Sequence, residues 1–317
     1  MGVRVPQYNA SLRMSVLAPG LSWIDLKFRD SPHVIATAVV SDSAGVALID
    51  PGPASCLETL ELGLSVQGMR FSDVTHILLT HVHLDHAGAT GTLVRRYPRL
   101  KVFVHERGTP HLIDPTKLVE SATRLYGDQM EQLWGEVAAV PASNIVTLDA
   151  TGERIDAAGR MFDVAYTPGH ASHHISFFDA SSGVAFVGDA AGIRIHGTYV
   201  RPPTPPPNID VELWRETAER IDAWGPQTMF LTHFGPSGDV RNHLQSLIEN
   251  LTSAAEWVRR SLLEPGTDDE KAGRYADYLA RELNRHLTGD QIPPHRVGAP
   301  FEVSWQGLAR YWRKKGG

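Results

Sequence analysis

The chain has 317 residues, of which 42% are hydrophobic, so it is long enough for one large domain or two modest ones around a packed core. Its net charge of −6 argues against nucleic acid or an anionic membrane surface as the main partner. The lone Cys56 excludes a disulfide within the chain, and neither a membrane span nor a secretory signal is recognisable. These features predict a cytoplasmic protein.

The first part of the chain reads as strands joined by tight turns. The apolar stretch 35–40 predicts a strand, residues 42–45 have turn chemistry, and residues 46–49 should pair back as the second strand of a hairpin. Asp50 follows that strand directly. It is either a turn residue or a carboxylate that accepts a hydrogen bond from a metal-binding imidazole.

Helices and strands then alternate. Residues 57–67 have helical spacing, residues 75–79 predict a buried strand, a helix follows at about 89–97, and residues 101–104 resume the sheet. This order predicts a sheet backed by helices. Residues 105–141 predict a helical insertion near the site, in which Tyr126 and Trp134 either line a pocket or belong to the core.

The second half of the chain is again rich in strands. Apolar segments at 162–166, 184–187 and 228–231 run into His170, Asp189 and His233 respectively. Polar residues at the ends of such strands are expected on one rim of the sheet. The proline-rich residues 201–207 should form a stiff loop near that rim. Further on, Asp210 should cap a helix over 211–221, and the chain from 239 onward is predicted to be helical.

The densest group of polar side chains is the run from Thr80 to Gly88, which follows a predicted strand. If the run is extended, successive side chains alternate, so that His81, His83 and Asp85 converge while Val82 and Leu84 pack behind them. His86 would then open the next element. Imidazole and carboxylate groups at this density favour a site for zinc or another first-row divalent ion. The alternative interpretation, a solvated histidine-rich loop, is disfavoured because Val82 and Leu84 are apolar.

Together the strand ends supply five imidazoles and two carboxylates, about the number that two metal ions need if each keeps an open or shared position. The seven candidate ligands are His81, His83, Asp85, His86, His170, Asp189 and His233. Asp189 is the natural bridge between two ions. His173 and His174 are candidates either for contacts to ligands or substrate or for packing. The other eight histidines are interpreted as surface or core residues: His33, His76, His105, His111, His196, His243, His286 and His295.

The succession His-x-His-x-Asp-His, Thr-Pro-Gly-His, Gly-Asp and Thr-His resembles the metallo-β-lactamase superfamily over about residues 20–240. The resemblance implies an α+β fold, a four-layer αβ/βα sandwich with a binuclear site at the rim between its sheets. It implies that His81, His83 and His170 hold one ion, that Asp85, His86 and His233 hold the second, and that Asp189 bridges them. Residues 1–240 would form the catalytic domain, and residues 241–317 a helical C-terminal extension packed on it.

The same resemblance implies a hydrolase of an ester, lactone or thioester, in which a hydroxide shared by two divalent ions, most simply zinc, attacks the carbonyl. Iron or manganese are the alternative metals. Asp85 would orient the nucleophile and move a proton. The expected partner is a small molecule; nucleic acid and membrane are not expected, and the oligomeric state is open.

Related branches of the superfamily offer alternatives. A mononuclear iron oxygenase similar to persulfide dioxygenases would use His81, His170 and Asp189. A phosphodiesterase or nuclease is disfavoured by the acidic balance of the chain. Lactonases place a tyrosine shortly after the bridging aspartate, where Tyr199 is the nearest candidate, and glyoxalase II is similar in the His174 region.

Overall fold

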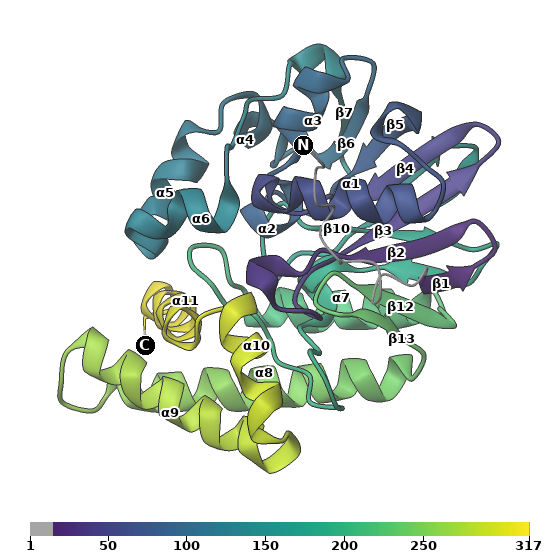
Figure 1. Ribbon diagram of the computed structural model, residues 1–317. Helices are drawn as coiled ribbons and strands as arrows, with labels where there is room; N and C mark the ends of the chain where they lie inside the picture. The colour runs from purple at the N-terminus through teal and green to yellow at the C-terminus, as the bar shows by residue number, and fades with distance from the viewer. Residues whose placement is uncertain (1–14, 317) are drawn as a thin grey trace.

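The computed structural model describes residues 15–316. Two β-sheets pack face to face, helices cover both outer faces, and further helices form the C-terminal part (Figure 1). The predicted absence of a secretory signal concerns mainly residues 1–14, which lie outside the described residues. No helix between residues 15 and 316 is both long and apolar enough to cross a membrane.

Within residues 15–316 the first sheet has seven strands, which follow the order of the sequence. Its strands are β1 Ser15–Ala18, β2 Leu21–Asp25, β3 Ala36–Asp42, β4 Gly45–Ile49, β5 Val74–Leu78, β6 Lys101–His105 and β7 Ile145–Leu148. Strands β1 to β4 are antiparallel, and β4 to β7 run parallel. The predicted hairpin is therefore present as β3 and β4, with Asp42 paired to Gly45.

In the described part of the chain, the second sheet has six strands in the order β13-β12-β11-β10-β9-β8. Its strands are β8 Thr151–Ala157, β9 Arg160–Tyr166, β10 Ile175–Asp179, β11 Val184–Phe186, β12 Thr228–Leu231 and β13 Gly235–Ser237. Strand β8 was not predicted from the sequence, because its exposed positions carry Thr, Gly, Arg and Asp rather than an apolar run. Strands β11 and β12 are parallel, and β9 points the same way as β11 because both are antiparallel to β10.

The helices occupy the outer layers and the C-terminal part. They are α1 Leu57–Val66, α2 Leu84–Ala87, α3 Thr90–Arg96, α4 Thr109–Ile113, α5 Thr116–Tyr126, α6 Met130–Trp134, α7 Val211–Ala223, α8 Val240–Leu262, α9 Asp268–His286, α10 Ile292–Gly298 and α11 Phe301–Lys314. The predicted cap is confirmed, since the Asp210 side chain accepts a hydrogen bond from the backbone N–H of Leu213. Residues 105–141 contain α4, α5 and α6, so the predicted helices are present, whereas their description as an insertion stays a prediction.

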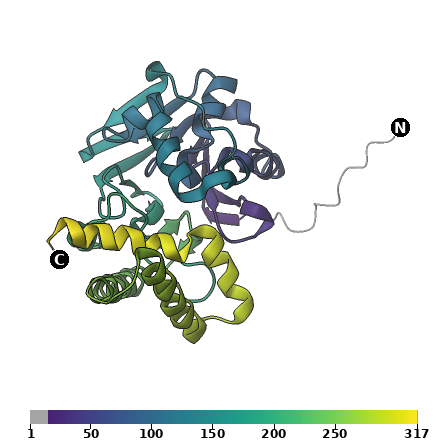
Figure 2. The ribbon, with the colours of Figure 1, turned by 90° about the vertical axis from the view of Figure 1, so that its left-hand side faces the viewer.

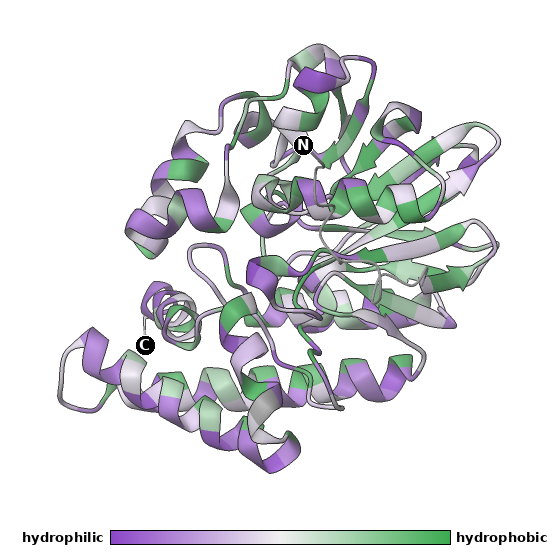
Figure 3. Ribbon diagram, in the orientation of Figure 1, coloured by the Kyte–Doolittle hydropathy of each residue, from purple (hydrophilic) through white to green (hydrophobic). Residues whose placement is uncertain are grey.

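Four groups of buried apolar side chains hold these layers together. One lies between the two sheets and includes Ile49, Phe177 and Phe230. Two others bury the outer faces of the sheets, with Leu60 of α1 on the first and Ile221 of α7 on the second. This confirms the predicted four-layer αβ/βα sandwich. Hydrophobic residues accordingly concentrate along the strands, whereas the outer helices alternate in character (Figure 3).

The C-terminal helices have an apolar core of their own. Trp305 and Tyr275 are buried in it, and Trp214 of α7 joins this core to the sandwich. The turned view shows α11 running across the ends of the other C-terminal helices (Figure 2). The division into residues 1–240 and 241–317 stays a prediction.

Asp179, at the end of β10, gives the fold an acid-sensitive contact. Its buried carboxylate accepts hydrogen bonds from Ser181, Ser182 and Arg160. Burial raises the pKa of Asp179, but these hydrogen bonds outweigh it, so the pKa lies below the ordinary value of 3.8. The stabilisation is therefore fully present above about pH 3.8 and is lost as the pH falls through the lower pKa of the folded state.

We expect Asp179→Asn to lower the free energy of unfolding by about 1.5–3 kcal/mol at pH 7, because the hydrogen bonds lose a charged acceptor. Urea unfolding at pH 7 and pH 3 should show this difference shrinking in acid. Asp163→Asn, which alters an exposed ion pair with Arg154, is the matched control and should change little at either pH. A difference at Asp179 that did not depend on pH would contradict the expectation.

Candidate metal centre

The polar residues that follow five strands meet at one rim of the sandwich. Asp50 follows β4, the segment 80–86 follows β5, and His170, Asp189 and His233 come after β9, β11 and β12. Strands β4 and β5 are parallel, and so are the directions of β9, β11 and β12, so the carboxyl ends of each set lie together. The structure brings all seven candidate ligands into one cluster, which we call the candidate metal centre.

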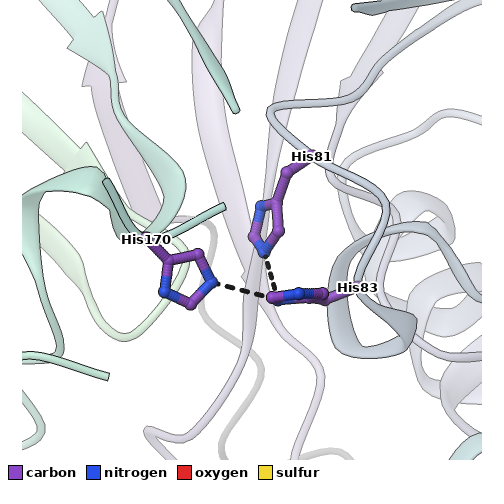
Figure 4. Close-up of side chains that lie close together, drawn as sticks. All are labelled: His81, His83 and His170. Atoms are coloured by element: carbon purple, nitrogen blue, oxygen red, sulfur yellow. Dashed lines mark hydrogen bonds between the residues drawn. The ribbon is translucent and has the colours of Figure 1, made fainter. Parts of the chain in front are cut away.

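One side of this centre consists of three imidazoles. Nδ1 of His83 lies 3.0 Å from Nε2 of His81 and 3.0 Å from Nε2 of His170 (Figure 4). A single ring nitrogen carries at most one proton, so it cannot serve both neighbours as an ordinary donor. Three nitrogens that converge in this way form a group that could hold a metal ion.

The other side is formed by Asp85, His86 and His233, which form a second group of potential ligands. Nε2 of His233 lies 3.2 Å from an Asp85 carboxylate oxygen. Asp189 lies between the two sides: one of its oxygens is 3.3 Å from Nε2 of His86, and the other is 3.6 Å from Nε2 of His170. This position suits the bridging role predicted for it.

The local conformation of the 80–88 segment differs from the expected extended run. Residues 81–83 are not helical, but the chain turns into helix α2 at Leu84, so strand-like alternation ends before Asp85. Asp85 and His86 are consecutive on this helical turn, and both face the centre. The helix forms because the backbone N–H groups of His86 and Ala87 bond back to the carbonyl of His83.

The second nitrogen of several imidazoles is held by an acceptor outside the centre. Nδ1 of His86 donates to Asp50 at 2.8 Å, Nδ1 of His170 to the carbonyl of Pro203 at 2.9 Å, and Nδ1 of His233 to the carbonyl of Val34 at 2.6 Å. A proton on Nδ1 leaves Nε2 as a free lone pair that points into the centre. These rings are thus orientated as metal ligands require.

Asp50 is the hub of the hydrogen bonds behind the centre. Besides His86, its buried carboxylate accepts from the backbone N–H of Thr80 at 2.8 Å, from the Thr80 hydroxyl at 2.7 Å and from the Thr232 hydroxyl at 2.9 Å. These bonds join the ends of β4, β5 and β12. They tie the first sheet to the second at the point where the candidate ligands meet.

Electrostatics keep the imidazoles of one side of the centre neutral, the form that binds a metal ion, and favour a positive charge on the other side. Burial, reinforced by neighbouring imidazoles, keeps the pKa of His81 well below its ordinary value and lowers that of His83 to about 3. Burial alone would also lower the pKa of His86, yet Asp189, Asp85 and Asp50 raise it well above its ordinary value. The carboxylates therefore stabilise a cation at this position.

Two buried atoms in the centre, Nε2 of His86 and the Asp189 oxygen 3.3 Å from it, form no hydrogen bond of good geometry with each other or with any other described residue. Leaving such atoms unpaired is costly, since each forfeits its hydration without a replacement. His86 and Asp189 form a further group of potential ligands together with His81. The ligand atoms of these three residues lie within 4.8 Å of one another. The residues present therefore fit divalent metal ions of the kind that bind imidazole and carboxylate.

The remaining candidates have different positions. His174 is buried behind the centre, where Nδ1 meets the Thr167 hydroxyl at 2.9 Å, and His173 lines the cavity described below. Tyr199 is not brought to the centre, because its ring packs on His286 within the C-terminal core. His111, interpreted from the sequence as a surface or core residue, is another residue of the cavity. This histidine lines the cavity 6.2 Å from the ring of His173, and only the folded insertion reveals it.

A cavity of 330 Å³ opens over the centre. Its floor includes His83, Asp85, His170, Asp189 and His233. Its walls come from three segments that are distant in sequence: α5 and α6, the proline-rich loop 203–207, and residues 298–304 around the start of α11. This volume is at the lower end of the roughly 300–1,000 Å³ typical of small-molecule sites.

Gly188 allows the second sheet to approach the centre closely. Its φ is +48°, and a Cβ atom there would lie 2.4 Å from the Thr80 hydroxyl and 2.9 Å from Nε2 of His174. We expect Gly188→Ala to lower the free energy of unfolding by about 2–5 kcal/mol, because the strain of the positive φ adds to the shift of the network behind the centre. Urea unfolding of the metal-free protein measures this loss.

Gly68→Ala is the matched control, since Gly68 also has a positive φ, +77°, but a Cβ atom there would meet nothing within 4 Å. It reports the backbone strain alone, about 1–2 kcal/mol. Equal losses in the two variants would contradict the role assigned to the contact between Gly188 and Thr80.

Comparisons with known proteins agree with this geometry. A sequence profile of the Metallo-beta-lactamase superfamily matches residues 32–233. The chain is 29% identical over 153 residues to the metallo-beta-lactamase fold-containing protein of Sulfurisphaera tokodaii, a match that covers 47% of this chain and 56% of that protein. It is 32% identical over 150 residues to a hydroxyacylglutathione hydrolase of a Synechococcus species, covering 47% of this chain and 44% of that enzyme. The chain thus spans about half the length of these curated relatives.

Among solved structures, the crystal structure of a metallo-beta-lactamase family protein from Thermus thermophilus matches with a TM-score of 0.70 and 25% identity, covering 95% of each chain. The profile match spans well over half of this sequence and contains every residue of the candidate metal centre. Fold, spacing of the motifs and profile agree, and the chain belongs to the metallo-beta-lactamase superfamily.

Proposed function

We propose that this protein is a binuclear metal-dependent hydrolase of an ester, lactone or thioester. The observation that carries the proposal is the pair of ligand groups, His81 with His83 and His170, and Asp85 with His86 and His233, between which Asp189 lies. Members of the superfamily bind metal ions, and most are hydrolytic enzymes. The similarity to a hydroxyacylglutathione hydrolase supports the same class of reaction.

Zinc is the proposed metal, because imidazole nitrogens, which suit an ion of borderline softness, outnumber carboxylates in both groups. Iron and manganese remain the alternatives. Two such ions would supply Lewis acidity and a water acidic enough to be a nucleophile near neutral pH. The second group supports two ions rather than one. If a single ion were held by His81, His170 and Asp189, the second group (Asp85, His86 and His233) would have no role.

Asp85 is the proposed proton-handling residue. Its side chain is 17% exposed and lines the cavity, whereas those of Asp189 and His86 are only 4% and 0% exposed. A carboxylate oxygen on the cavity side can orient an attacking water and accept its proton, then release the proton to the leaving group. The floor residues that lie deeper have no such access.

The walls of the cavity would hold the acyl part of the substrate and keep bulk water away. Trp134 stacks on Phe28 at 5.6 Å between ring centroids and meets Tyr126 edge-on at 5.2 Å. Tyr126 and Trp134 thus form a rigid aromatic wall, which favours the pocket role over the purely structural one. The proposed partner is a small molecule. Neither nucleic acid nor a membrane surface is proposed as a partner.

A substrate screen of the metal-loaded protein tests the proposal. It should hydrolyse at least one of a thioester, a lactone and an aryl ester, and the rate should vanish with a chelator and return with zinc. A phosphodiester should react more slowly than these acyl substrates. Turnover of the phosphodiester alone, or oxygen uptake on a persulfide without any acyl hydrolysis, would overturn the proposal.

A further inference from the structure

Helix α5 presents a basic ridge to the cavity. Lys117, Ser121 and Arg124 line it and are four and three residues apart, which places them on one face of the helix. Leu118 and Leu125, each one residue further on, line the same cavity. The polar and apolar halves of this face therefore both contribute to the wall.

The positive charges on this ridge are not neutralised by salt bridges. Neither Lys117 nor Arg124 forms one with any residue in the described part of the chain, whereas Arg95 and Arg313 are paired with carboxylates on the surface. Asp114 lies near Lys117, but its carboxylate accepts hydrogen bonds from Thr116. Glu120 is three residues from Lys117 and four from Arg124 on the same helix, but it does not line the cavity. Among the residues that line the cavity, the only carboxylates are Asp85 and Asp189 at the floor.

The two ends of the cavity differ in character. Lys117 and Arg124 are exposed, so they lie on its solvent side, whereas the candidate ligands of the floor are mostly buried. Between these ends the walls are largely apolar. They include Leu118, Leu125, Trp134, Ile193, Pro205 and Val303. Helices α5 and α6 lie opposite α11 in Figure 1, and residues of both parts line the cavity.

We infer that the substrate is a small molecule with an apolar body and an anionic end, whose negative group is held by Lys117 and Arg124 while its scissile carbonyl lies at the metal centre. This inference rests on the proposed function and specifies its substrate class. A carboxylate suits the planar guanidinium of Arg124, which can bind both oxygens at once, and the ammonium of Lys117 adds a second donor. The apolar walls would receive the chain that joins the two groups.

Equilibrium binding to the metal-loaded protein tests the inference without requiring turnover. Calorimetry would compare dicarboxylates from glutarate to suberate with monocarboxylates of the same chain length, from pentanoate to octanoate. One carboxylate of each ligand can bind the metal centre, so the affinity ratio within a pair reports the second carboxylate. We expect a ratio of about ten at the best chain length, beyond the statistical advantage of two equal ends.

Variants of Lys117 and Arg124 test whether the preference for dicarboxylates comes from the basic ridge. Lys117→Gln combined with Arg124→Gln should bring the ratio down to the statistical value, and Arg124→Lys should restore part of it. Lys101→Gln, which removes an exposed charge from β6 outside the cavity, should leave the ratio unchanged. Raising the salt concentration should reduce the ratio for the wild-type protein.

The outcomes separate this inference from the proposed function. A wild-type protein that shows no preference for dicarboxylates at any chain length, or a preference that survives in the double variant, overturns the inference. Acyl hydrolysis in the substrate screen would still uphold the proposed function in that case. Conversely, a preference that depends on the ridge, without any acyl hydrolysis, would uphold the anion site and remove the hydrolase.

Discussion

Asp189→Asn is expected to lower acyl hydrolysis by more than the roughly 10–100-fold that loss of a contact outside the ligand shell costs. The reason is the position of this carboxylate, with one oxygen 3.3 Å from Nε2 of His86 and the other 3.6 Å from Nε2 of His170. Asparagine keeps the shape but loses the negative charge, and its amide nitrogen cannot bind a metal ion as a carboxylate oxygen does. Metal content should fall from two ions per chain toward one.

Elemental analysis and steady-state kinetics on the same preparation measure both effects. Asp163→Asn on β9, a change of the same chemistry at a half-buried position away from the centre, is the control and should keep both metal content and turnover. Thermal unfolding should show that Asp189→Asn remains folded. Full metal content together with full turnover in Asp189→Asn would refute the bridging role of this residue.

Asp50→Ala is expected to have the largest effect on stability, a loss of about 3–5 kcal/mol in the free energy of unfolding. The substitution removes the acceptor of four hydrogen bonds at once, from His86, from the hydroxyl and backbone N–H of Thr80, and from Thr232. Buried donors left without an acceptor lose their hydration and gain nothing in return. Since Asp50 also fixes the His86 ring, metal affinity should fall by roughly 10–100-fold.

Unfolding in urea with a chelator present separates the stability effect from that of bound metal, and a metal titration then measures the affinity. Asp277→Ala, on the exposed side of α9, controls for the loss of an aspartate and should change neither quantity appreciably. A variant of Asp50 as stable as the wild-type protein would mean that the hydrogen bonds behind the centre do not hold the two sheets together.

Most of the fold was predictable because strands and helices here follow simple patterns. The hairpin of β3 and β4 rests on two apolar runs on either side of a turn, and α7 begins at the predicted Asp210 cap. Strand β8 lacks an apolar run, so no local signal distinguished it. It is held by its pairing with β9, a contact that exists only after folding.

The clustering of the candidate ligands was predictable for a different reason. Each of these residues follows an apolar strand, and the carboxyl ends of parallel strands share one edge of a sheet. The turn into α2 was not foreseen, because Leu84 fits an extended run as well as a helix and the hydrogen bonds to His83 decide between them. The cavity was beyond prediction for the same kind of reason: His111, Lys117 and Val303 come from segments that meet only in the folded chain.

Metal identity and stoichiometry, measured by elemental analysis of protein purified without added metal, test the central claim most directly. Two groups of ligands around Asp189 predict close to two equivalents of a divalent ion per chain, with zinc the expected metal. Titration of the metal-free protein with zinc should reach the same end point, and it should fall to about one equivalent in a His86→Ala, His233→Ala double variant. One equivalent of iron in the wild-type protein, with no second ion taken up on titration, would contradict the binuclear hydrolase.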